Sequence, residues 1–140
     1  MVATPARTGW ATAAAVLYAL WGVLHVGLGV TMVAGGLSAG LPDEETAAES
    51  LMFFLCAIVF GAQAVVVAVT LNRVNDRVGH WLNLTVLGAV DLAFLVVLVL
   101  PGHVDLAGGL SGPLLWLLAA ICSTLAMRAG TPRGNGRVFP

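Results

Sequence analysis

The chain has few charged residues and no lysine. Only 9% of its 140 residues are charged, whereas 59% are hydrophobic. Soluble domains carry about 25% charged residues, and so small a chain cannot hide this much apolar surface in a soluble core. The scarcity of charge therefore argues against a soluble protein and favours a membrane protein. No basic face with interleaved aromatic residues is left over, so we expect no nucleic-acid partner. Cations that are all arginine are typical of a GC-rich bacterial genome.

Cysteine is scarce as well. Cys56 and Cys122 are the only two, and the motifs Cys-x-x-Cys and Cys-x-x-Cys-His are absent. Their absence excludes covalently attached c-type haem and a paired-thiol oxidoreductase. The two cysteines also fall at different depths of the apolar runs, whereas a disulfide needs Cα atoms within about 7 Å. We read both as small buried apolar residues.

What the chain does contain is four long apolar runs, Trp10–Ala34, Leu51–Leu71, Trp81–Leu100 and Pro113–Met127. About 20 apolar residues span a membrane core, and the first three runs reach that length. The fourth is shorter and begins at a proline, which the first turn of a helix tolerates. We therefore expect an all-α fold, an integral membrane four-helix bundle with short loops, forming one domain over residues 1–140.

The arginines all flank one end of these runs, at Arg7, Arg73, Arg77, Arg128, Arg133 and Arg137. The two remaining connections carry acids instead, at Asp43, Glu44, Glu45, Glu49 and Asp105. Flanking cations stay on the cytoplasmic side of a membrane. The pattern therefore predicts a multi-pass protein of the bacterial inner membrane with both termini in the cytoplasm. Residues 128–140 are expected to form a basic, disordered cytoplasmic tail.

Small residues recur along the second run at spacings of four, three and four, at Ala57, Gly61, Ala64 and Ala68. Small side chains let helix backbones approach closely in a membrane. This face should pack against another helix, either of this chain or of a second copy. Trp10 and Trp81 stand at the inner ends of their runs, where amphipathic rings anchor helices.

Two polar residues are expected deep in the membrane. Asp91 lies ten residues after Trp81, ~15 Å along a helix, and Gln63 lies twelve residues after Leu51, ~18 Å from the opposite side. These depths nearly match, and the short connection at 72–77 makes the second and third helices neighbours. We therefore expect a hydrogen bond between Gln63 and Asp91. Such a pair either fixes the bundle or makes Asp91 a functional group.

The first run carries a face of unusual composition, with residues at spacings of three and four: Tyr18, Trp21, Gly22, His25 and Gly29. An imidazole facing lipid would leave its nitrogens unpaired, so this face should turn inward and line a cavity open to the outer leaflet. Aromatic walls, space beside the glycines and a histidine suit a hydrophobic ligand such as a lipid, quinone or sterol-like molecule. The alternative is a packed core in which the histidine is simply hydrogen-bonded.

A haem is a weaker candidate than these ligands. Bis-histidine ligation would need a second histidine at the depth of His25, but His80 lies at the inner boundary and His103 in an outer loop. His103 also accompanies Asp105 near the outer acids, yet the spacing matches no metal-binding motif, and we read these residues as solvated.

Three functions remain open, because no catalytic constellation is evident in the sequence. We favour a non-enzymatic bundle that binds a partner protein or hydrophobic ligand. One alternative is a proton- or solute-coupled transporter using Asp91, as a homodimer. Another is a membrane redox or lipid-modifying enzyme using Tyr18, Trp21 and His25. Expected partners are the bilayer, a hydrophobic small molecule, and a second copy or larger membrane complex.

Overall fold

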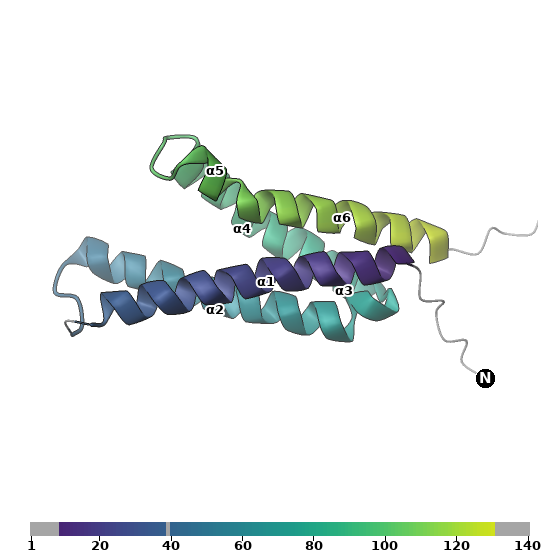
Figure 1. Cartoon of the computed structure of the whole chain (residues 1–140), viewed down its shortest axis with the longest axis horizontal. Helices are drawn as coiled ribbons and strands as arrows, with labels where there is room; N and C mark the ends of the chain where they lie inside the picture. Colours follow the sequence, from purple (N-terminus) through teal and green to yellow (C-terminus); the bar gives the residue numbers. More distant parts are fainter. Residues whose placement is uncertain (1–8, 39, 131–140) are drawn as a thin grey trace, which may run out of the picture.

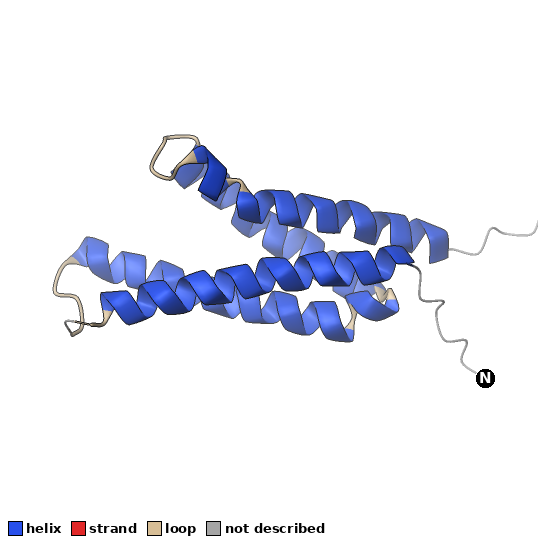
Figure 2. Cartoon of the chain, viewed as in Figure 1, coloured by secondary structure: helices blue, strands red, loops and turns tan. Residues whose placement is uncertain are grey.

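A computed structural model describes residues 9–38 and 40–130, and every regular element in them is helical (Figure 2). The elements in chain order are α1 (Gly9–Gly36), α2 (Glu45–Thr70), η1 (Asn72–Val74), α3 (Arg77–Leu82), η2 (Asn83–Leu87), α4 (Gly88–Phe94), η3 (Leu95–Val99), α5 (Leu106–Gly109) and α6 (Ser111–Gly130). These elements form four helical segments that are long and apolar enough to cross a membrane: Gly9–Gly36, Glu45–Val74, Arg77–Val99 and Leu106–Ala129. The expected all-α architecture is confirmed, with four helical segments whose length and composition suit a membrane, and we call these segments the spans.

The spans are longer than the apolar runs from which they were predicted. α2 begins at Glu45 rather than at Leu51, and the third span begins at Arg77 rather than at Trp81. α6 starts at Ser111, so that Pro113 occupies its first turn, where a proline fits a helix. The described part of the tail continues α6 to Gly130, and residues 131–140 lie outside the described residues.

The third span is not a regular α-helix. α3 and α4 alternate with η2 and η3, two five-residue turns of π-helix. A π turn has a wider hydrogen-bonding ring than an α turn, and such turns are frequent at functional sites. Gly88 follows η2 and makes room for the ring of Trp116, since a Cβ there would lie 2.5 Å from Trp116 Cζ2. Trp116 Nε1 donates to the Leu84 carbonyl, 3.2 Å away, within this irregular turn.

α1 and α2 pack against one another through glycine. A Cβ on Gly22 would lie 2.5 Å from the Gly61 carbonyl oxygen, and a Cβ on Gly61 would lie 2.7 Å from the Gly22 carbonyl oxygen. This reciprocal contact is the close backbone approach expected of small residues in a membrane. Ala64 and Ala68 are buried beside it in the core with Tyr18. The small-residue face of the second helix therefore packs within this chain.

The connection between the second and third spans is held by local hydrogen bonds. Asn75 adopts a left-handed conformation with φ of 59°, which asparagine tolerates. Asp76 then caps α3 by accepting from Val78 N and Gly79 N. Asn75 Nδ2 donates to the Ala126 carbonyl of α6, 3.0 Å away, and so ties this turn to the fourth span.

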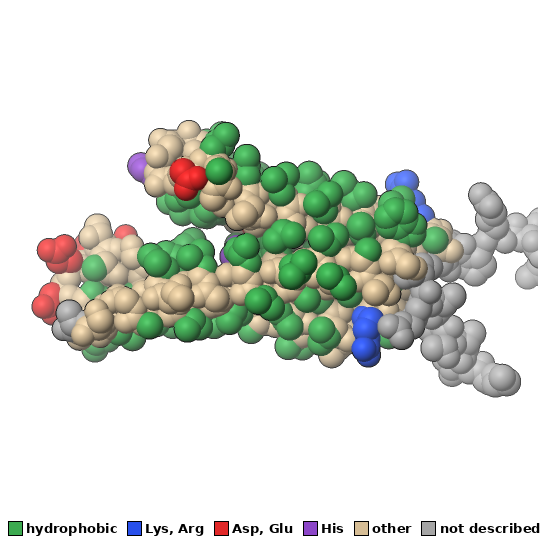
Figure 3. Space-filling model, viewed as in Figure 1, with side chains coloured by type: hydrophobic (Ala, Val, Ile, Leu, Met, Phe, Trp, Pro, Cys, Tyr) green, Lys and Arg blue, Asp and Glu red, His purple; other side chains and the backbone are tan. Residues whose placement is uncertain are grey.

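The start of α1 and the end of α6 lie at the same end of the molecule (Figure 1). Arginine side chains gather at that end, whereas the acids of the other two connections, which we call the loop acids, gather at the opposite end (Figure 3). Many large apolar side chains face outward between the two ends, among them Val23, Val59 and Val97. Cys56 and Cys122 are both free thiols, and Cys56 is exposed, so the expectation that both are buried is wrong.

Candidate functional site

Asp91 of α4 is buried and accepts a hydrogen bond from Trp21 of α1. Trp21 Nε1 lies 3.0 Å from Asp91 Oδ2 and 3.3 Å from Asp91 Oδ1. Trp21 is fully buried and Asp91 is 2% exposed. A buried indole N–H needs an acceptor, and a buried carboxyl group needs a donor. This single contact meets part of both requirements and ties the first span to the third.

His25 lies one turn further along α1 and stacks on Trp21. The two ring centroids are 3.7 Å apart with an interplanar angle of 20°. His25 Nδ1 is 2.7 Å from the Trp21 carbonyl oxygen. A carbonyl oxygen can only accept, so Nδ1 carries the hydrogen and, in the neutral ring, Nε2 presents a lone pair. The ring is therefore fixed in orientation with Nε2 directed away from its own helix.

Gly112, in the first turn of α6, completes this group. A Cβ on Gly112 would lie 3.3 Å from His25 Nε2 and 3.6 Å from Asp91 Oδ1. Both acceptor atoms thus lie beside the backbone of Gly112, where a Cβ would also come within 3.0 Å of His25 Cε1. Three spans contribute to the site, with His25 and Trp21 from α1, Asp91 from α4 and Gly112 from α6.

The site lies near a notch between the halves of the spans that end at the loop acids. We call these the outer halves, and the halves that end at the arginines the inner halves. Beyond His25, Gly29 is the one described residue of α1 that is buried, and a Cβ there would meet Ile58 and Phe54 of α2. On the other side, Val99 packs against Gly109 of α5. The outer ends thus form two separate pairs, α1 with α2 and η3 with α5. Figure 3 shows the gap between them, opening at the acidic end. We call this gap the outer notch.

The glycines of the first helix do not open space for a ligand, which corrects that expectation. Gly22 and Gly29 both face α2, and each would clash with it if it carried a Cβ. Successive helical residues are about 100° apart, so Gly22 points well away from Trp21. Tyr18 and Trp21 do turn inward, but both are fully buried in packed core rather than lining a cavity. Among these five residues, His25 alone is partly exposed.

The expected bond between Gln63 and Asp91 is also corrected. Gln63 Nε2 instead donates to Asn83 Oδ1, 3.2 Å away. Asn83 lies on the third span, as Asp91 does, but about two turns nearer the inner end of that span. Asn83 Nδ2 in turn donates to Asn72 Oδ1 at 2.8 Å. The position of a residue along a helix determines its depth in the bundle, but it does not determine which neighbouring helix its side chain faces. Gln63 therefore belongs to an amide cluster in the inner half, with Asn83 and Asn72.

Other polar side chains are also buried in the inner half. His80 Nδ1 lies 2.7 Å from Ser123 Oγ, which joins the third span to α6. Two buried atoms, Tyr18 Oη and Asn72 Nδ2, have no hydrogen-bond partner among the described residues. The run pattern gave no weight to Asn72, His80 or Asn83 because they stand at the ends of apolar runs. One signal in the sequence was available: polar residues stand at similar depths on neighbouring apolar runs, which indicates that they can pair.

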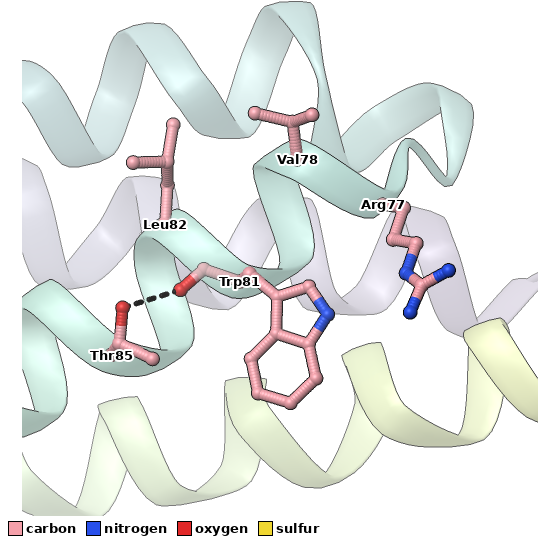
Figure 4. Close-up of a pocket in the computed structure, with 5 residues that line it drawn as sticks. All are labelled: Arg77, Val78, Trp81, Leu82 and Thr85. Atoms are coloured by element: carbon pink, nitrogen blue, oxygen red, sulfur yellow. Dashed lines mark hydrogen bonds between the residues drawn. The ribbon is translucent and has the colours of Figure 1, made fainter.

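A separate shallow hollow lies on the outside of the third span near its arginine end. It is lined by Arg77, Val78, Trp81, Leu82 and Thr85 (Figure 4). Thr85 Oγ1 donates to the Trp81 carbonyl, 2.7 Å away. Trp81 is half exposed, as is Trp10, in keeping with rings that anchor helices at an interface. The hollow is far from Asp91 along the helix and shares no residue with the site.

Comparisons with protein-family models, curated proteins and solved structures found no match to this chain. Argument about its function therefore rests on the site itself.

Proposed function

We propose that the chain is a four-span membrane protein that binds a hydrophobic molecule in the outer notch, with the polar end of that molecule against His25 and Asp91. The proposal includes a bacterial inner-membrane location with both termini in the cytoplasm. Its support is the separation of charges, because the described arginines and the loop acids lie at opposite ends of the four spans.

The observation that carries the binding proposal is the position of His25. It is the one member of the predicted ligand-binding face that remains partly exposed, and beyond it Gly29 is the one buried residue among those of α1 that the structure describes. Apolar side chains such as Leu28, Met32 and Val96 are exposed on the outer halves. An apolar cleft that ends in a few convergent polar groups is the usual form of a small-molecule site.

Photolabelling tests the proposal. The protein in phosphatidylcholine nanodiscs is irradiated with two C16 probes that carry a mid-chain diazirine, one ending in a hydroxyl and the other in a primary amine. We expect at least one probe to label residues 26–36 and 95–112 saturably, with an excess of unlabelled amphiphile preventing the labelling. Labelling spread evenly over the exposed faces of all four spans, with neither probe saturable, would contradict binding in the notch.

A transporter is the second candidate, favoured by the contrast between the two halves of the molecule. The outer notch opens at the acidic end (Figure 3) and His25 is partly exposed, while in the inner half Gln63, Asn83 and Asn72 form a hydrogen-bonded amide cluster. A site open to one side at a time is the arrangement that alternating access requires. Proton-driven uptake of the bound amphiphile into vesicles, abolished by Asp91→Asn, would favour transport over simple binding, and binding without any uptake would count against it.

A further inference from the structure

We propose that the molecule bound in the outer notch is a long-chain primary amine in its protonated form, with Asp91 as its counter-ion and His25 Nε2 as a second hydrogen-bond acceptor. This inference rests on the proposed binding function and specifies the chemistry of the ligand.

The base of the notch presents acceptors. His25 Nδ1–H is engaged by the Trp21 carbonyl, which leaves the lone pair of Nε2 facing Gly112. The Trp21 N–H is shared between the two oxygens of Asp91, so the carboxylate keeps most of its accepting capacity. A ligand group that only accepts, such as a quinone carbonyl, would meet like atoms there. A group that donates N–H or O–H fits.

Charge decides between an amine and an alcohol. The described arginines Arg73, Arg77 and Arg128 stand at the ends of their helices, and even Arg77, the first residue of the span that holds Asp91, lies fourteen residues before it, ~21 Å along a helix. A buried carboxyl group avoids the cost of its charge by binding a proton or by pairing with an opposite charge, and in the proposed complex the ligand supplies that opposite charge. An alcohol supplies one donor and no charge, whereas an ammonium group supplies a full positive charge and three donors. The ammonium group therefore satisfies both requirements of the site.

Geometry favours a slender ammonium group over a bulky one. His25 Nε2 and Asp91 Oδ1 lie 3.3 and 3.6 Å from the position that a Cβ on Gly112 would take, so the two acceptors are close to one another. Asp91 is 2% exposed, so the approach to it is narrow. A quaternary ammonium would bring three methyl groups and no donor. Asp91 also lies near the middle of Arg77–Val99, deeper than the headgroup of a phospholipid, which favours a free amine over an aminophospholipid.

The test uses C12 amphiphiles that differ only at the polar end. Dodecylamine, 1-dodecanol and dodecyltrimethylammonium compete with the photoreactive amine for labelling of the notch in phosphatidylcholine nanodiscs. We expect dodecylamine to compete at least ten-fold more strongly than either of the others. In Asp91→Asn, competition by dodecylamine should weaken about ten-fold, to the level of competition by 1-dodecanol. The reason is that the asparagine amide keeps an acceptor for Trp21 but carries no charge. Phosphatidylethanolamine added to the nanodiscs should not compete.

Gly112→Ala and Gly27→Ala provide a matched pair of controls. A Cβ on Gly112 would come 3.0 Å from His25 Cε1 and 3.6 Å from Asp91 Oδ1, so that the His25 ring would have to shift, whereas a Cβ on Gly27 meets nothing within 4 Å. We expect amine competition to weaken in Gly112→Ala and to stay unchanged in Gly27→Ala, with both variants folded as judged by circular dichroism.

The outcomes separate this inference from the binding function. If the notch is labelled saturably but the alcohol or the quaternary ammonium competes as well as the amine, or if Asp91→Asn changes nothing, the amine assignment is wrong and notch binding stands. Competition by phosphatidylethanolamine would overturn the assignment to a free amine. If neither probe labels the notch, the binding function itself fails.

Discussion

The hydrogen bond between Trp21 and Asp91 can be tested by a double-mutant cycle. Trp21→Phe removes the indole donor but keeps a ring that can stack on His25, and Asp91→Ala removes the acceptor. Each single change leaves a buried polar group unpaired, because Trp21 is fully buried and Asp91 is 2% exposed. An unpaired buried group costs about 1–3 kcal/mol. We therefore expect each single variant to lose about that much free energy of unfolding.

The double variant should lose less than the two single losses together, because it leaves neither group orphaned. Hydrogen bonds between membrane helices average about 0.6 kcal/mol and reach about 1.7 kcal/mol. The short 3.0 Å contact and complete burial of the indole place this bond towards the upper value, so we expect a coupling energy of about 1–2 kcal/mol. Reversible unfolding in mixed micelles with sodium dodecyl sulfate, followed by far-ultraviolet circular dichroism, measures all four proteins. Strictly additive losses would show that the two side chains do not stabilise one another.

Three further predictions concern packing, the inner amide cluster and topology. Gly22→Ala should lose about 1–3 kcal/mol through overpacking against Gly61, whereas Gly27→Ala should be neutral or slightly stabilised; equal stabilities in the same unfolding assay would contradict the glycine contact. Asn83→Leu should lose about 1–3 kcal/mol because it strands buried polar groups, yet leave notch photolabelling unchanged. An enzymatic reporter fused after Pro140 should be active only in the cytoplasm, and periplasmic activity would refute the orientation.

The number of spans could be read from the sequence because apolar composition alone determines which segments suit a membrane core. The helix ends could not. Glu45–Ser50 lies outside the apolar run and suggests at most a short helical or capped turn, yet it forms the first turns of α2, because nothing in those residues ends a helix once the apolar part has formed. The same holds for Arg77–His80, where Asp76 supplies the cap. Hydropathy locates the membrane-crossing part of a helix and says little about its solvated ends.

The members of the site were predicted better than their partners. Trp21, His25 and Asp91 stood out as polar or aromatic groups at membrane depth, and the structure brings all three together. The partner of Asp91 was missed because Trp21 was read as an aromatic wall rather than as a donor that needs an acceptor. Gly112 gave no sequence signal, because a glycine in a glycine-rich segment matters only through what a Cβ there would touch.

The two halves of the molecule satisfy their polar groups in different ways, and this difference argues for where function lies. In the inner half, Gln63 donates to Asn83 and Asn83 donates to Asn72, which holds helices together, and the atom left without a partner among the described residues there is a donor, Asn72 Nδ2. In the outer half, one indole N–H serves both oxygens of Asp91, and His25 Nε2 has an accepting lone pair next to an open notch. Acceptors in excess of donors at membrane depth are costly unless a donor arrives from elsewhere. The inner cluster therefore has the properties of a structural element, and the outer pair has those of a site that a ligand completes.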